Sequence, residues 1–317
     1  MPAPVKPRAL RPGDAIRVIA PSSPVDVTKL EQGIEELKRL GFSVLRQPRV
    51  LAQAGYFAGT SKERLNELLD AIRESESRAI FCARGGYGSA YLLDDLSGEV
   101  PSLQSRHESK SLVGYSDITA LQNFLWRKCG WITFYGPMVA AGLDSVNGAP
   151  GGYDRTSLLR AVTETKTGWT LDLSGETLVA GQSEGTLVGG CLTLLVSTLG
   201  TPWAISARDS LLLLEDRAMK PWQVDRSLMH LLQAGALEGV RGIIFGDFPE
   251  CEAPKGSATV RDVIERVAGP FGVPIVWNVA VGHTNRPMLT IPLGVRARLS
   301  ADSSTQLEIL EPACIDG

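Results

Sequence analysis

The sequence predicts an α/β protein with two domains. Over the first 140 residues, short apolar segments alternate with amphipathic segments whose apolar residues recur at helical spacing, a pattern typical of strands joined by helices. Residues 142–184 are rich in glycine, serine, threonine and proline, and from residue 185 strands and helices follow in a mixed order. We therefore expect an N-terminal domain over 1–141, a linker region with some structure of its own over 142–184, and a mixed C-terminal domain over 185–317.

The expected N-terminal domain consists of strands separated by helices. Its strands are predicted over 15–20, 44–45, 79–83, 111–115 and 132–135. Thr28 with Glu31, and Thr60 with Glu63, each match the capping box that begins a helix. A further helix is predicted after residue 117. Strands separated in this way favour a mostly parallel sheet with helices on both faces.

The expected C-terminal domain is less regular. Its strands are predicted over 210–214, 242–245, 274–279, 295–299 and 306–310, and its helices over 192–199, 224–234 and 259–267. The longest uncharged stretch, 185–207, has a helical part too short to span a bilayer. We interpret that stretch as a buried core helix followed by a loop.

Composition and charge exclude several classes of protein. The 317 residues are 44% hydrophobic and 21% charged, with a net charge of −3, so there is no basic surplus to bind a nucleic acid backbone. The first residues show no apolar signal segment, and no membrane association is expected. The five cysteines are odd in number and lack Cys-x-x-Cys spacing, which favours small core residues in a reducing, cytoplasmic compartment.

Ser116 is the most informative residue, because it follows a predicted strand and precedes a predicted helix. A serine at such a turn projects its hydroxyl clear of the backbone, and the next amide, on Asp117, can stabilise an oxyanion. Gly114 matches the first glycine of the Gly-x-Ser-x-Gly turn, but Ile118 occupies the position of the second. A nucleophile and a simple helix cap are both compatible with this pattern.

A nucleophilic serine needs a base, usually a histidine, and an acid that orients it. The chain has three histidines that could be the base. His107 lies in a polar segment expected as an exposed loop, and His230 lies among leucines of a predicted helix, where a partly buried structural role is expected. His283 follows an apolar strand, where sites in open sheets collect. Glu215 is the first acid after another apolar strand; it is either an orienting carboxylate or a solvated strand end.

A glycine-rich turn follows the predicted strand 79–83. Its glycines would let backbone amides approach a ligand closely, and Gly86 is the candidate second oxyanion donor. The alternative is dinucleotide binding, but Tyr91 stands where the Gly-x-Gly-x-x-Gly pattern needs its last glycine. No His-x-x-x-His pair, Cys/His cluster or Walker motif is present, so neither a metal nor a cofactor is expected.

Taken together, these segments resemble the LD-carboxypeptidase family of serine peptidases, which includes the microcin-immunity peptidases. The matching segments are 10–22, 83–90, 114–121, 135–138, 184–190, 212–216, 224–226, and 282–283 with 291–294. They occur in the family's order along nearly the whole chain.

The resemblance implies a catalytic triad of Ser116, Glu215 and His283, with oxyanion donors on the backbone of Gly86 and Asp117. It also implies a Rossmann-like N-terminal domain, a C-terminal domain with a barrel-like sheet, and a homodimer. Substrate contacts are expected from side chains near the matching segments, namely Arg84, Tyr87 and Tyr135.

Two departures from the family pattern concern the substrate. The family commonly has Asn where this chain has Cys191, and its carboxypeptidases commonly have His where this chain has Tyr135. The segments 133–137 and 282–284 look more like the microcin-immunity branch.

Two classes of function follow. The first is a cytoplasmic serine carboxypeptidase that acts on a small peptide. Its substrate would be a murein tetrapeptide, from which it removes the terminal D-alanine during peptidoglycan recycling. In the other branch of the family, the substrates would be toxic aminoacyl- or peptidyl-nucleotide amides. The second is a non-hydrolytic dinucleotide-binding protein.

Overall fold

The computed structural model describes residues 2–106, 108–145 and 147–316. The chain folds into two compact units. The first comprises Met1–Thr165, Arg286–Pro292 and Ala313–Gly317, and the second comprises Lys166–Asn285 and Leu293–Pro312. Among the described residues, no helix combines the length and the apolar character needed to cross a membrane.

The first unit is built on a six-stranded sheet in the order β12-β5-β4-β3-β1-β2. Its strands are β1 (Ala15–Ile19), β2 (Ser43–Arg46), β3 (Ala79–Cys82), β4 (Ser111–Gly114), β5 (Thr133–Tyr135) and β12 (Ile291–Leu293). The pairings among β1 to β5 are parallel. Every residue of β3, β4 and β5 is buried, as expected for a parallel sheet covered on both faces. The predicted fold class of this unit is confirmed.

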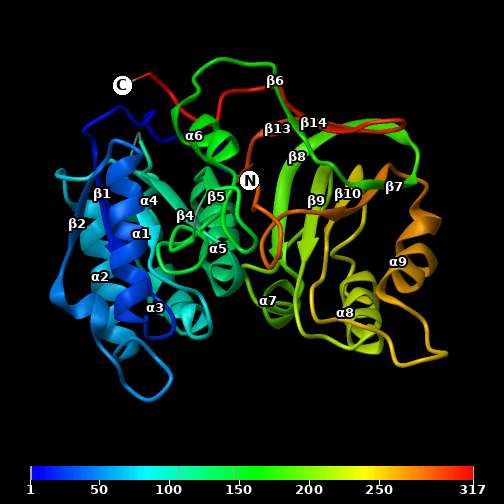
Figure 1. The fold of residues 1–317 in the computed structure, drawn as a ribbon, viewed down its shortest axis with the longest axis horizontal. Helices are drawn as coiled ribbons and strands as arrows, with labels where there is room; N and C mark the ends of the chain where they lie inside the picture. Colours follow the sequence, from blue (N-terminus) through cyan, green and yellow to red (C-terminus); the bar gives the residue numbers. More distant parts are fainter. Residues whose placement is uncertain (1, 107, 146, 317) are drawn as a thin grey trace. The chain divides into compact units, whose positions relative to one another are not determined.

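Helices connect these strands along the chain. They are α1 (Val27–Arg39), α2 (Ser61–Arg73), α3 (Leu93–Ser97), α4 (Val100–Gln104), α5 (Thr119–Cys129) and α6 (Arg155–Thr163), with short 3₁₀ helices η1 (Pro48–Leu51), η2 (Ser89–Leu92) and η3 (Ser116–Ile118). In Figure 1, α1 lies against β2, α2 against β1, and α5 against β5. The capping box of Thr60 and Glu63 at the start of α2 is confirmed.

The capping box predicted at Thr28 is wrong. The helix α1 begins at Val27, and the side chain of Asp26 accepts the hydrogen bond from the amide of Lys29, 2.9 Å away. The carboxylate of Asp26 therefore caps the helix two residues before the predicted position.

The second unit is built on an eight-stranded mixed sheet in the order β6-β14-β13-β8-β9-β10-β11-β7. Its strands are β6 (Trp169–Asp172), β7 (Glu176–Val179), β8 (Gly181–Cys191), β9 (Ser210–Glu215), β10 (Gly242–Gly246), β11 (Ile275–Val279), β13 (Arg296–Ala301) and β14 (Thr305–Ile309). β8 to β11 are parallel, and the outer pairs are antiparallel. The mixed α/β class is confirmed, and the barrel-like form of this sheet stays a prediction.

Three helices, α7 (Leu192–Ser197), α8 (Pro221–Gln233) and α9 (Val260–Ala268), and the 3₁₀ helix η4 (Gly269–Phe271) complete the second unit. α8 packs against α9 (Figure 1). The expected linker region 142–184 contains α6, β6, β7 and the beginning of β8.

The strand β8 corrects the interpretation of the uncharged stretch. Residues 185–191, expected as part of a helix and loop, form the second half of this strand, and only 192–197 are α-helical. Glycines suit β8 because neighbouring backbone lies so close: a Cβ at Gly189 would lie 2.0 Å from the carbonyl oxygen of Leu213 on β9.

Candidate active site

Ser116 occupies a strained turn in the first unit. It is the first residue of η3, between β4 and α5, and its φ is 61°, a left-handed conformation that is unusual for a residue other than glycine and is found disproportionately at functional sites. Its amide donates a hydrogen bond to the hydroxyl of Tyr135, 3.2 Å away. The alternative role as a helix cap is wrong, because the cap positions of η3 and α5 are Tyr115 and Ile118.

Asp117 joins three loops that follow neighbouring strands of the sheet. Its Oδ2 accepts hydrogen bonds from the hydroxyl of Ser22, 2.6 Å away, and from the amide of Ser89, 2.8 Å away. Its carbonyl oxygen accepts a hydrogen bond from the Ser89 hydroxyl at 2.5 Å. Ser22 follows β1, Ser89 follows β3 and Asp117 follows β4, so this buried carboxylate fixes the loops at the carboxyl edge of the sheet, where sites of open α/β sheets form.

Two backbone amides near Ser116 differ in exposure, since Gly86 is exposed and Asp117 is buried. Within the described part of the chain, the amides of Gly86 and Asp117 donate no hydrogen bond. The loop that carries Gly86 lies against the serine, since a Cβ at Gly85 would be 3.1 Å from the Ser116 Cβ and 3.3 Å from its Oγ. Unbonded amides next to a hydroxyl are what an oxyanion site requires.

Gly86 is held in a position that only glycine fits. Its φ is 100°, and a Cβ there would lie 2.4 Å from the Oγ of Ser23. That hydroxyl in turn accepts a hydrogen bond from the amide of Tyr87, 3.0 Å away. The conformation of the glycine-rich turn is therefore fixed by the loop after β1 as well as by its own sequence.

Arg64 supports the same loops, and sequence reasoning did not identify it. Its side chain is buried, and its Nη1 donates to the carbonyl oxygens of Pro21, at 2.5 Å, and Gly88, at 2.7 Å. The guanidinium also lies over the ring of Phe57, 4.9 Å from the centroid. Arg64 lies within α2, where a charged residue usually lies on a solvated face, so no local pattern in the sequence indicates this role.

The three expected substrate contacts differ in their surroundings. Arg84 is exposed, and its Nη1 donates to the carbonyl oxygen of Pro24 at 2.9 Å. Tyr87 is exposed, and its ring stacks on that of Phe57 with the centroids 5.9 Å apart. Tyr135 is fully buried, and its hydroxyl accepts the hydrogen bond from the amide of Ser116, so it supports the Ser116 turn.

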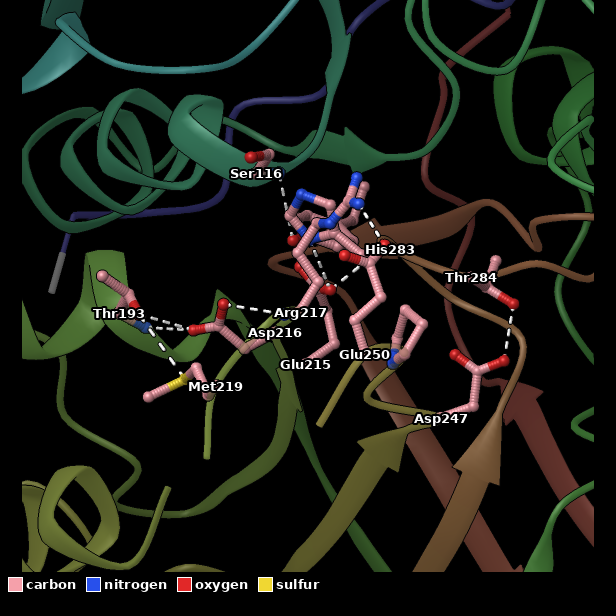
Figure 2. A network of polar contacts seen from close by, with 12 residues as sticks. Ser116, Thr193, Glu215, Asp216, Arg217, Met219, Asp247, Glu250, His283 and Thr284 are labelled. Carbon is pink, nitrogen blue, oxygen red and sulfur yellow. Dashed lines mark hydrogen bonds and ion pairs between the residues drawn. The ribbon is translucent and has the colours of Figure 1, made fainter. Parts of the chain in front are cut away.

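Glu215 and His283 form a hydrogen-bonded pair in the second unit. Glu215 ends β9 and is fully buried. Its Oε2 accepts a hydrogen bond from the backbone amide of His283 and lies 2.9 Å from the imidazole Nδ1 (Figure 2). Gly246 and Gly282 leave room for the carboxylate: a Cβ at Gly282 would lie 2.4 Å from its Cδ. The carboxylate thus holds both the backbone and the ring of His283.

The charge of Glu215 changes the titration of the imidazole. Burial lowers the pKa of His283, but the charge of Glu215, its hydrogen bond and the charge of Asp216 raise it, and the net pKa lies above the ordinary value of 6.5. The imidazolium form is therefore stabilised, which is what a base that receives a proton during a reaction needs.

Asp216, next to Glu215, faces a different partner. Its Oδ2 accepts hydrogen bonds from the amide and hydroxyl of Thr193, at 2.8 and 2.7 Å, as Figure 2 shows. Burial and the neighbouring Glu215 charge raise the pKa of Asp216 against the effect of these hydrogen bonds. The two adjacent carboxylates are thus divided between His283 and the start of α7.

His230 does not form part of these clusters. His107 lies outside the described residues. His230 is exposed on α8, so the expected partly buried position is wrong: Leu228 and Leu231 on the neighbouring face of the helix are the buried residues. The five cysteines are buried, as predicted for core residues.

Comparison with known proteins identifies the family. Residues 16–136 match the LD-carboxypeptidase N-terminal domain, and residues 184–299 match the LD-carboxypeptidase C-terminal domain. The probable murein peptide carboxypeptidase of Bacillus subtilis (strain 168) is 38% identical over 305 residues, which cover 95% of this chain and 93% of that protein. The chain belongs to the LD-carboxypeptidase family, a family of carboxypeptidases.

Solved structures share the fold along the full chain. The muramoyltetrapeptide carboxypeptidase from Oxalobacter formigenes is 26% identical with a TM-score of 0.80, covering 96% of this chain and 100% of that one. The structure of MccF in complex with glutamyl sulfamoyl guanosine has a TM-score of 0.86 at 23% identity, covering 98% and 99%. The latter likeness concerns the fold. The predicted resemblance is confirmed.

Proposed function

We propose that this protein is a serine carboxypeptidase that hydrolyses the L,D-amide bond to the terminal D-alanine of murein tetrapeptides. The observation that carries the proposal is the pair formed by the buried Glu215 and His283, with Oε2 and Nδ1 2.9 Å apart. This is the arrangement that keeps a proton on Nδ1 and leaves Nε2 as the base. The kinship with a murein peptide carboxypeptidase supports the choice of substrate.

Each proposed residue has a defined step. Ser116 attacks the carbonyl carbon of the scissile amide while His283 takes the hydroxyl proton. The amides of Gly86 and Asp117 bind the oxyanion of the tetrahedral intermediate. His283 then returns the proton to the amine of the departing D-alanine, and water hydrolyses the acyl-enzyme by the same route. Glu215 holds the imidazole and stabilises its charge throughout. Arg84 and Tyr87 are proposed to contact the peptide, and Tyr135 to hold the Ser116 turn.

The setting of the reaction is also a proposal. Family resemblance supports a homodimer that acts in the cytoplasm on murein peptides recovered during peptidoglycan recycling. The sequence segments 133–137 and 282–284 favour a second candidate, cleavage of aminoacyl- or peptidyl-nucleotide amides, as in the microcin-immunity branch.

A parallel substrate assay tests the proposal. The purified 317-residue protein is incubated with murein tetrapeptide, with the same peptide ending in L-alanine, and with an aminoacyl sulfamoyl adenosine, and the released amino acid is quantified. We expect kcat/KM for the D-alanine peptide to exceed that for the L-alanine peptide by at least about 100-fold, because the site must orient one configuration of the leaving residue. Cleavage of the adenosine conjugate alone would replace the murein substrate with the second candidate. Dinucleotide binding without hydrolysis of any of the three would overturn both.

The oxyanion role of Gly86 predicts a large effect of one added methyl group. Gly86→Ala forces a Cβ against the Ser23 Oγ and displaces the loop, so kcat for D-alanine release is expected to fall about 100-fold, the effect of losing one oxyanion donor. The matched control is Gly13→Ala, where φ is 91° but no atom lies within 4 Å of the added Cβ. If both variants lose activity equally, backbone strain rather than the loop position explains the effect.

A further inference from the structure

Cys191 lies beside Glu215 and His283 in the second unit. It ends β8, and its register partner on the adjacent parallel strand β9 is Glu215. One ligand atom from each of the three residues, a thiol sulfur, a carboxylate oxygen and an imidazole nitrogen, lies within 4.8 Å of the other two. This cluster cannot be predicted from local sequence, because the three residues are far apart in the chain and match no metal-binding spacing.

The three side chains are a ligand set for a particular class of cation. Thiolate and imidazole prefer borderline and soft ions such as Zn²⁺, and a carboxylate completes the sets found in zinc sites. Ligand atoms around a tetrahedral zinc lie about 3–4 Å from one another. The Glu215–His283 pair is already at 2.9 Å, and the Cys191 sulfur lies within 4.8 Å of a ligand atom of each. Mg²⁺ and Ca²⁺, which need more oxygen ligands, do not fit.

We propose that Cys191, Glu215 and His283 bind one thiophilic divalent cation of the Zn²⁺ class, and that the bound ion inhibits the enzyme. On binding, the thiol releases its proton to solvent, so that one thiolate and one carboxylate balance the two positive charges of the ion. His283 is the exposed member of the cluster, with 13% of its side chain accessible against none for Glu215. The ion therefore enters past the imidazole, and water occupies the fourth position.

The bound ion inhibits the enzyme whether Nδ1 or Nε2 of His283 coordinates it. The inhibition rests on the proposed function, whereas cation binding does not. If Nδ1 coordinates the ion, the ring proton resides on Nε2 and no lone pair remains to accept a proton. If Nε2 coordinates it, the ion occupies that lone pair directly. In both cases His283 cannot deprotonate the serine hydroxyl. When Nδ1 coordinates the ion, the hydrogen bond from Nδ1 to Glu215 is also lost.

Cobalt absorption tests the binding without reference to activity. Co²⁺ replaces Zn²⁺ in such sites, and a cysteine ligand produces a thiolate-to-cobalt charge-transfer band. Titration of the reduced 317-residue protein with Co²⁺ is expected to produce this band, saturating at one equivalent. Cys191→Ser should abolish the band, and His283→Gln should weaken cobalt binding by at least about 100-fold, more than the loss of a group that only orients a ligand. The matched control is Cys129→Ser, a buried cysteine at the end of α5, which should keep the parental band.

The second measurement is the effect of Zn²⁺ on D-alanine release. We expect Zn²⁺ to inhibit the parent and Cys129→Ser equally, and to inhibit Cys191→Ser at least about 100-fold more weakly. We expect Mg²⁺ to have no effect on any of the three. If no peptidase activity exists, the cobalt band still decides the binding proposal. Absence of the band in the parent, or its persistence in folded Cys191→Ser, would overturn the site. A band without inhibition by Zn²⁺ would overturn the inhibitory role.

Discussion

Ser116→Ala is expected to lower kcat for D-alanine release by about 10⁴-fold or more, because a triad without its nucleophile retains only the contributions of binding and oxyanion stabilisation. The φ of 61° at this position supports the prediction, since the protein tolerates strain there that a mere turn residue would not require. Single-turnover release of D-alanine from the tetrapeptide is the measurement, with folding checked by circular dichroism.

Two further variants separate chemistry from folding. Ser111→Ala, on the preceding strand β4, removes a buried hydroxyl that has no hydrogen-bond partner among the described residues, so it should leave kcat unchanged. Ser116→Gly should be inactive yet more stable than the parent by about 1 kcal/mol, because glycine adopts a positive φ without steric cost. Activity of Ser116→Ala close to that of the parent would refute the nucleophile.

Glu215→Gln is expected to lower kcat by about 10⁴-fold, the magnitude associated with losing the acid that orients a catalytic histidine. The substitution keeps the shape but removes the charge that raises the pKa of His283. A general base acts only in its neutral form, so the acidic limb of the parental kcat/KM profile should lie above pH 6.5, the ordinary histidine value. In Glu215→Gln the His283 pKa should fall, and this limb should move to lower pH.

The control for this variant is the adjacent carboxylate. Asp216→Asn changes a buried acid that binds Thr193 instead of the imidazole, and we expect a loss in kcat of about 10-fold or less, typical of a residue acting at a distance through charge. An NMR titration of the imidazole resonances measures the pKa of His283 directly. The chain has three histidines, so few resonances need assignment, and His230→Gln identifies one of them. Equal losses in the two variants, or a His283 pKa unchanged in Glu215→Gln, would remove Glu215 from the proposed triad.

Prediction from sequence succeeded where one physical pattern governed a whole element. The buried strands β3, β4 and β9 are each built around a short apolar run, and Thr60 with Glu63 forms the expected capping box. It failed for β8, whose glycines disfavour strands in isolation. They are required there because the backbone of β9 approaches too closely for a side chain, and that approach is a tertiary contact that local sequence does not contain.

The residues of the candidate site also fall into those that local sequence predicts and those that it does not. The turn at Ser116 and the acid at Glu215 were predicted because each follows a recognisable strand, and the hydrogen bond of Glu215 to His283 is now visible in the structure. Arg64 and Cys191 were not predicted as site residues. Arg64 acts through two carbonyl groups of distant loops, and Cys191 meets Glu215 through strand register. Neither relation leaves a local pattern in the sequence.

The path of the chain has a consequence for how this protein can be divided or recombined. After leaving the first unit at Thr165, the chain returns to it at Arg286–Pro292 and again from Ala313. β12 forms the edge of the first sheet beside β5, and the amide of Ile315 donates to the carbonyl of Pro7 at 2.9 Å. A fragment ending at residue 165 would therefore lack an edge strand and the support for its own beginning. The two units cannot be exchanged between relatives at a single junction, because a chimera must match several junctions at once, and removal of the residues from Ala313 onward would damage the unit that the first residues build.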